Sequence, residues 1–118
     1  MSRRTRRASE AFKEELSEII QREVKDPRVG FVTIMEVKVS PDLRKARVYL
    51  GILGDDDEVA QTLAGLESAK GYMRAHLGKH LRLRFLPEIE FKHEHTAEDA
   101  LELERLIRKS KEEGQGDR

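Results

Sequence analysis

The chain has 118 residues, a length that suits one domain with a single hydrophobic core. Its 23 basic and 23 acidic residues leave no formal net charge, so total charge gives no reason to expect a nucleic-acid partner. The absence of cysteine excludes a disulfide framework and a thiol nucleophile. No apolar run approaches the roughly 18 residues that span a bilayer, and no signal-peptide core follows the basic start. We therefore expect a cytoplasmic protein with no membrane partner and no cofactor.

The first predicted element is an amphipathic helix over about residues 8–25. Apolar side chains recur every three or four positions from Ala8 to Val24, which places them on one helical face. Asp26-Pro27 ends the helix, because the residue before a proline is disfavoured in the α conformation. Residues 1–7 precede this pattern and are predicted to form a basic tail.

Two strands are predicted next, over residues 31–39 and 46–53. The second run alternates apolar and other residues with the period of two that a half-buried strand requires. Ser40-Pro41-Asp42 supplies turn residues between the runs. The short connection favours an antiparallel hairpin.

A second helical region begins at Asp55, which forms a capping-box pattern with Glu58. Its helical spacing continues to Gly78, with an interruption at Gly71 that predicts two short helices or one kinked helix. Residues 81–85 and 88–92 then alternate around Pro87, which predicts a third strand with a break, bulge or edge position at the proline.

The last segment, residues 96–118, is predicted to be a helix capped by Thr96 and running to Ile107, then a disordered tail. The core domain is residues 8–95. The element order is helix, strand, strand, helix, helix, strand. It predicts an α+β fold, a three-stranded sheet covered on one face by helices, with an extra C-terminal helix.

Positive charge is concentrated in particular segments. Residues 69–85 contain five cations and no acid, and further cations lie in the N-terminal stretch and the predicted hairpin. Phosphates are the usual counter-ions of such a surface. A merely solvated face is the competing interpretation, but the lack of interleaved acids weakens it. We predict phosphate contacts from Arg3, Arg4, Arg6, Arg7, Arg44, Lys45, Arg47, Lys70, Gly71, Arg74, Lys79, Arg82 and Arg84.

Gly71 is predicted to mark a kink between two helices that serves either binding or packing. A glycine inside a helix costs about 1 kcal/mol relative to alanine. The kink could turn the N-terminus of the second helix toward an anion, flanked by Lys70, Arg74 and Lys79. A corner that serves packing alone explains the glycine equally well.

Catalytic and metal-binding patterns are weak. His76 and His80 could share a helix face, and His93 and His95 flank Glu94, but a zinc site needs three or four convergent ligands. No nucleophile elbow and no phosphate-binding loop is present. We therefore predict no metal site and no enzyme.

Several motifs occur in an order that resembles one bacterial family. They are Asp26-Pro27-Arg28-Val29, the run from Val37 to Tyr49 around Ser40-Pro41-Asp42, Ala69-Lys70-Gly71-Tyr72-Met73-Arg74, and the run from Leu81 to Phe91. In these motifs, and over about residues 3–107, the chain resembles the ribosome-binding factor A family.

The resemblance implies a type II K-homology (KH) fold in which an Ala-x-Gly kink, here Ala69-Lys70-Gly71, replaces the usual G-x-x-G loop. It implies a non-enzymatic assembly factor that binds the immature 30S subunit and its 16S rRNA. Such factors act in late maturation, including 16S 5′-end processing, and support growth in the cold. A small-subunit GTPase helps their release in many bacteria. Glu94-His95-Thr96 departs from the family pattern before the last segment.

The leading hypothesis is therefore a monomeric rRNA-binding assembly factor whose basic tail orders on rRNA. A second hypothesis is a protein–protein adaptor that docks through its sheet edge or last helix. A small hydrolase is the third and weakest hypothesis.

Overall fold

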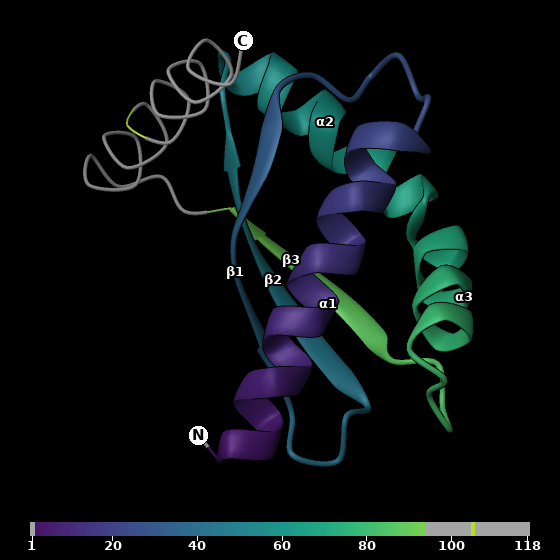
Figure 1. Cartoon of the computed structure of the whole chain (residues 1–118). Helices are drawn as coiled ribbons and strands as arrows, with labels where there is room; N and C mark the ends of the chain where they lie inside the picture. Colours follow the sequence, from purple (N-terminus) through teal and green to yellow (C-terminus); the bar gives the residue numbers. More distant parts are fainter. Residues whose placement is uncertain (1, 94–104, 106–118) are drawn as a thin grey trace, which may run out of the picture.

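The computed structural model describes residues 2–93 and residue 105 (Figure 1). Within residues 2–93, three helices and three strands follow one another in the predicted order, which confirms the α+β class and the type II KH arrangement. They are α1 (Arg3–Arg22), β1 (Val32–Val39), β2 (Lys45–Ile52), α2 (Asp56–Ser68), α3 (Lys70–His80) and β3 (Glu88–His93). Apart from residue 105, the predicted helix over 96–107 and the tail after it lie outside the described residues.

The sheet has the order β1-β2-β3. β1 and β2 are antiparallel, as the predicted hairpin requires, and β3 runs parallel to β2. Val37 lies opposite Val48, and Val48 lies beside Phe91, so apolar residues of the three strands share one face. A β-bulge between Ile34 and Glu36 interrupts the alternation in β1 and so keeps both Ile34 and Val37 on this face.

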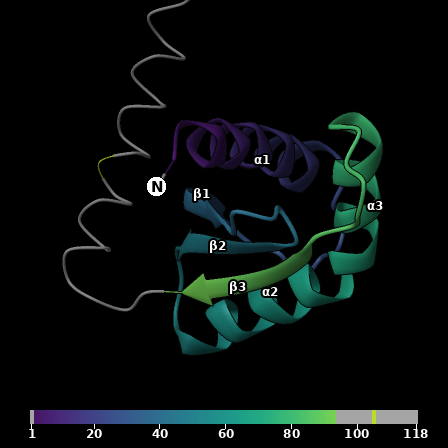
Figure 2. The same ribbon diagram turned by 90° about the horizontal axis from the view of Figure 1, so that it is seen from below.

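One hydrophobic core lies between this face and the helices. Val48 of β2, Leu16 of α1, Leu66 of α2 and Leu77 of α3 are completely buried in it. α1 lies in front of the sheet in Figure 1 and beside it in Figure 2. The opposite face carries charged side chains, and no helix of the described residues covers it.

The predicted basic tail is wrong, because α1 begins at Arg3. Ser2 caps the helix by accepting a hydrogen bond from the backbone N–H of Thr5. Thr5 and Ser9 are buried and extend the face of Phe12 toward the N-terminus. Apolar periodicity missed this turn and a half because small polar residues continue the buried face there.

The predicted strand over residues 81–85 is also wrong. Leu83 N–H donates to the Gly78 carbonyl, and Arg82 adopts a left-handed conformation with φ of 52°. This is a Schellman motif, which ends α3 and satisfies its last carbonyls. Leu81 and Leu83 pack against the core. Their alternation therefore reflects the packing of a helix C-terminus.

The predicted break between two helices is confirmed, but it lies at Ala69. This residue ends α2 and begins α3, with φ −86° and ψ −3°. Asp55 and Glu58 form the predicted capping box at the start of α2. The structure thus has two helices joined by a one-residue corner, and Gly71 lies in the first turn of α3.

Candidate nucleic-acid interface

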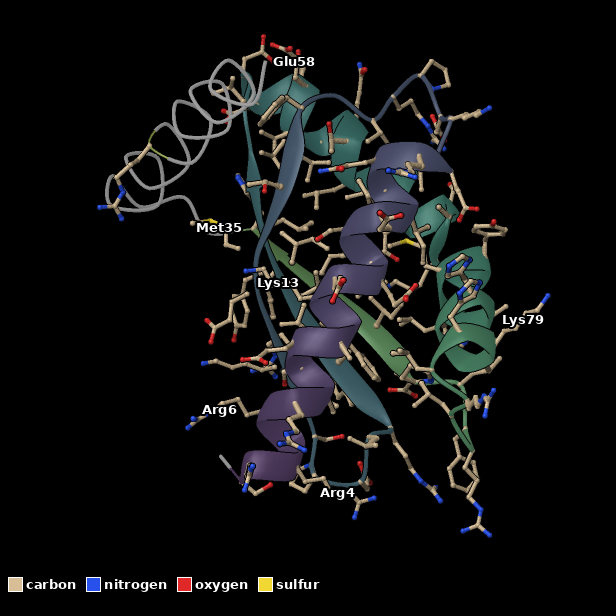
Figure 3. All side chains as sticks on the ribbon, viewed as in Figure 1. Arg4, Arg6, Lys13, Met35, Glu58 and Lys79 are labelled. Atoms are coloured by element: carbon tan, nitrogen blue, oxygen red, sulfur yellow. The ribbon has the colours of Figure 1, made fainter. Side chains whose placement is uncertain are left out.

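Three basic segments meet at one end of the molecule. β1 ends there, β2 and β3 begin there, and the first turns of α1 lie beside them, with the Val39 N–H donating to Ser9 Oγ. Figure 1 shows the start of α1 next to the β1–β2 hairpin, and Figure 3 shows Arg4 and Arg6 there. We call this surface the basic end; it comprises Arg3, Arg4, Arg6, Arg7, Arg44, Arg82 and Arg84.

The arginines at the start of α1 interact unfavourably with the dipole of their own helix. Its first turn contains no acid, although the N-terminus of a helix dipole favours negative charge. Arg3 and Arg7 are one turn apart, so they also repel each other. No described residue forms an ion pair with the four arginines at the start of this helix, from Arg3 to Arg7. Folding alone does not account for this arrangement, whereas a polyanion would neutralise it.

The hairpin presents Arg44 on a turn fixed by side chains. Ser40 Oγ donates to Asp42 Oδ1 at 2.6 Å, and Asp42 Oδ1 accepts the backbone N–H of Arg44. These hydrogen bonds, that of Ser40 first, lower the pKa of Asp42. Leu43 adopts a left-handed φ of 61°. The turn is therefore held in one conformation, and Arg44 projects from it.

The segment between α3 and β3 joins the hairpin. The guanidinium of Arg44 lies 4.0 Å from the centre of the half-exposed Phe85 ring, a cation–π contact, and the Arg44 carbonyl accepts the Glu88 N–H. Arg82 and Arg84 are exposed on this segment. Lys79 lies on the adjacent last turn of α3 and points outward in Figure 3. An exposed aromatic ring among cations is the combination that stacks on bases of single-stranded nucleic acid.

Two predicted residues, Lys45 and Arg47, lie on the open face of the sheet. Both pair with Glu90 of β3, at 3.4 Å and 3.8 Å, and Lys92 contacts the same carboxylate at 2.8 Å. The hydrogen bond from Lys92, more than that from Lys45, lowers the pKa of Glu90. Three cations around one acid leave a local excess of positive charge beside Glu90 on this face.

Sequence reasoning missed two cations of this face. Lys38 lies opposite Arg47 in the register, and Lys92 lies beside Tyr49. The strand period would have found them, because residues paired across strands point to the same side of a sheet.

The cations predicted to flank the kink do not gather around it. Lys70 pairs with Glu67 at 2.8 Å and lies over the Phe91 ring. Arg74 donates from Nε to the Pro87 carbonyl at 2.7 Å and from an Nη to the Leu86 carbonyl at 3.3 Å, so it holds the chain before β3. Lys79, predicted to flank the start of α3, lies at its other end, roughly 14 Å along the axis.

Gly71 has open space around it. A Cβ atom added there would meet no other atom within 4 Å. The α3 N-terminus has no side-chain cap, and no acid lies in its first turn. Neither packing nor backbone conformation of the described residues therefore requires glycine at this position.

Acidic residues gather at the opposite end. The capping box and first turn of α2 contain Asp55, Asp56, Asp57 and Glu58. Figure 3 shows Glu58 at the end of the molecule away from Arg4 and Arg6. The zero net charge thus conceals a polarised body. Among the described helices, none is long and apolar enough to cross a membrane.

The comparison with known proteins decides the family. The family model described as ribosome-binding factor A matches residues 4–107. The chain belongs to this family.

Relatives and solved structures agree. Ribosome-binding factor A of Dictyoglomus thermophilum is 50% identical over 97% of this chain and 93% of the relative. The protein of Halothermothrix orenii is 44% identical over 98% of this chain and 94% of the relative.

The solution structure of a putative ribosome-binding factor A from Thermotoga maritima matches with a TM-score of 0.70 and 34% identity, covering 82% of this chain and 93% of that one. A model of the Thermus thermophilus factor, fitted into a cryo-EM map of its complex with the 30S subunit, matches with a TM-score of 0.56 and 30% identity. It covers 70% of this chain and 86% of that one.

Proposed function

We propose that this protein binds the free, immature 30S subunit through its 16S rRNA and supports late maturation, including 5′-end processing. The observation that carries the proposal is the basic end, where seven arginines from three segments face outward with no ion pair inside the described chain. Family membership supports this target, since a related factor has been fitted into a map of its 30S complex. Such binding belongs in the cytoplasm.

The proposed action needs no catalysis. A protein that binds one conformation of rRNA more tightly than another shifts the population toward the first. The arginines suit this role because a guanidinium forms forked contacts with phosphate. Phe85, beside Arg44, adds a ring on which an unpaired base can stack. A monomer suffices, and the resemblance extends the proposal to a GTPase that assists release.

The Ala69–Gly71 corner is a second contact in this proposal. Because Gly71 has no side chain and no neighbour, a sugar–phosphate backbone can approach the first turn of α3 closely. The uncapped N–H groups there favour an anion. The contact would be made by backbone atoms, since Lys70 and Arg74 already hold partners within the chain.

The salt dependence of 30S binding tests the basic end. We expect Arg82→Gln with Arg84→Gln to weaken binding and to reduce the slope of log K against log salt by about 1.4–1.8, because each lost phosphate contact removes roughly 0.7–0.9. Arg4→Gln with Arg7→Gln should act similarly and should not lower the melting temperature, since it relieves repulsion in α1. Filter binding across a salt series measures the slope.

The matched control is Arg22→Gln with Lys25→Gln, which removes two exposed cations at the other end of α1. It should leave the slope unchanged. Equal slopes for all three double variants would refute the basic end as the contact surface. Nuclease treatment of an extract separates the adaptor hypothesis, because an adaptor would keep its partner after complete RNA digestion.

A further inference from the structure

Two histidines and a glutamate converge between α1 and α3, away from the basic end. His76 and His80 are one turn apart on α3, with their rings stacked at 3.9 Å between centres. Glu15 of α1 faces both rings: its Oε2 lies 3.6 Å from His76 Nε2 and 4.0 Å from His80 Nδ1. One ligand atom from each residue lies within 4.8 Å of the other two. We propose that Glu15, His76 and His80 bind one Zn²⁺ ion.

The donor set suits this metal. Zn²⁺ takes imidazole nitrogen and carboxylate oxygen in tetrahedral geometry, and three protein ligands leave one position for water. A histidine pair four residues apart on a helix is a recurring way to supply two of these ligands. The sequence around His76 and His80 predicts no metal site, because it offers no third ligand nearby. The fold supplies it from Glu15, 61 positions before His76.

The distances are close to those that a bound ion requires. Bonds of 2.0–2.1 Å in a tetrahedron place the ligand atoms about 3.3 Å apart. The two distances to Glu15 Oε2 must therefore shorten by about 0.3–0.7 Å. The side chains of His76, Glu15 and His80 are 15%, 29% and 48% exposed, so rotations of these side chains at the surface can bring the three ligand atoms closer together.

An outer carboxylate orients one ligand. Glu23 lies 3.4 Å from His76 Nδ1, so it can accept the proton of that nitrogen. The lone pair of Nε2 then faces Glu15, and two acceptor atoms oppose each other unless a cation lies between them. A carboxylate behind a ligating histidine is the usual support of a zinc site. Without a metal ion, the imidazole of His76 would need a second proton in order to donate a hydrogen bond to Glu15.

The site lies at the surface and joins two helices. The His80 side chain is 48% exposed, so the fourth coordination position is open to water. A bound Zn²⁺ ion would link α1 to α3, and these two helices pack around part of the core. A ligand that binds only the folded state raises its stability with concentration.

Calorimetric titration of the full chain with Zn²⁺, after removal of metal by a chelator, tests the site. We expect one ion per chain and a melting temperature that rises with Zn²⁺. Glu15→Gln and His80→Gln should weaken binding by more than roughly 100-fold, and Glu23→Gln by about 10–100-fold, as for outer carboxylates in other zinc sites. His93→Gln on β3 is the control and should bind as the parent does.

Glu15→Gln keeps the size of the side chain, and circular dichroism checks that each variant is folded. The proposal is overturned if the parent binds no Zn²⁺ at micromolar concentrations, since the groups are then joined by protons alone. It is also overturned if both ligand variants bind as tightly as the parent, because the ion then lies elsewhere.

Discussion

At the scale of single residues, the Asp26 carboxylate is a charge held in place by several hydrogen bonds. It accepts the backbone N–H of Arg28 at 2.9 Å and the Arg28 guanidinium at 2.6 Å. These contacts, the side-chain hydrogen bond first, lower the pKa of Asp26 from 3.8 to about 2. Arg28 also donates to Ser68 Oγ of α2. The Asp-Pro-Arg motif therefore fixes the turn after α1 onto α2.

This pair predicts a pH dependence of stability. Because the folded-state pKa of Asp26 is depressed, its contribution is present above about pH 4 and is lost as the pH falls toward 2. The melting temperature of the parent should fall more steeply across this window than that of Asp26→Asn. At neutral pH the variant should be less stable. Thermal denaturation at a series of pH values measures both.

The control is Glu14→Gln, which removes an exposed carboxylate of α1 that forms no ion pair with a described residue. Its profile should keep the slope of the parent between pH 4 and 2. If Asp26→Asn also keeps that slope, the Arg28 contact does not persist in solution.

At the scale of elements, α3 connects three parts of the molecule. Its first turn forms the corner with α2, its middle holds the segment before β3 through Arg74, and its C-terminus turns through Arg82 into that segment. Between its two ends, α3 contacts the core through the buried side chains of Met73 and Leu77. The helix is thus fixed along its length, and its exposed first turn is free for another role.

Gly71→Ala tests that role. A Cβ atom meets nothing there, so alanine should raise helix stability by about 0.5–1 kcal/mol. If the backbone of the corner contacts rRNA, the same change should weaken 30S binding. Opposite signs for stability and binding are the expected result. Thermal denaturation and 30S filter binding measure the two quantities.

Ala75→Gly, at an exposed position of the same helix, is the matched control. It should lower stability by a similar amount and leave binding unchanged. A loss of stability in Gly71→Ala would mean that the chain itself requires glycine there, and unchanged binding would exclude the corner from the interface.

At the scale of the whole molecule, charge is separated along one axis. The arginines lie where β2 and β3 begin, and the acidic start of α2 lies beyond the other end of β2. Such a body has no net charge, yet its potential orients it as it approaches a polyanion. In the proposed complex, the acidic end would face away from the rRNA, and this would favour one orientation of binding.

Sedimentation tests whether the whole protein associates with free 30S subunits. We expect the tagged protein to travel with free 30S subunits in a sucrose gradient of a cell extract and to be absent from polysomes. The Arg82→Gln, Arg84→Gln variant should shift to the top of the gradient, while Arg22→Gln, Lys25→Gln should stay with 30S. Parent protein in polysome fractions would contradict a role confined to assembly.

Local patterns in the sequence determined the elements and most of their ends. The capping box of Asp55, the hairpin turn at Ser40 and the break near Ala69 depend on residues within a few positions of one another, so the sequence specifies them directly. The start of α1 could not be predicted from apolar spacing, because Thr5 and Ser9 rather than apolar residues continue its buried face.

Tertiary structure alone decided which distant groups meet. Arg74 was predicted to contact phosphate, but it holds the carbonyl of Pro87, 13 residues away. Glu15 meets His76 and His80 only because α1 packs against α3. Hydrophobic burial selects these pairings, and burial depends on the packing of whole elements, which no short stretch of sequence encodes.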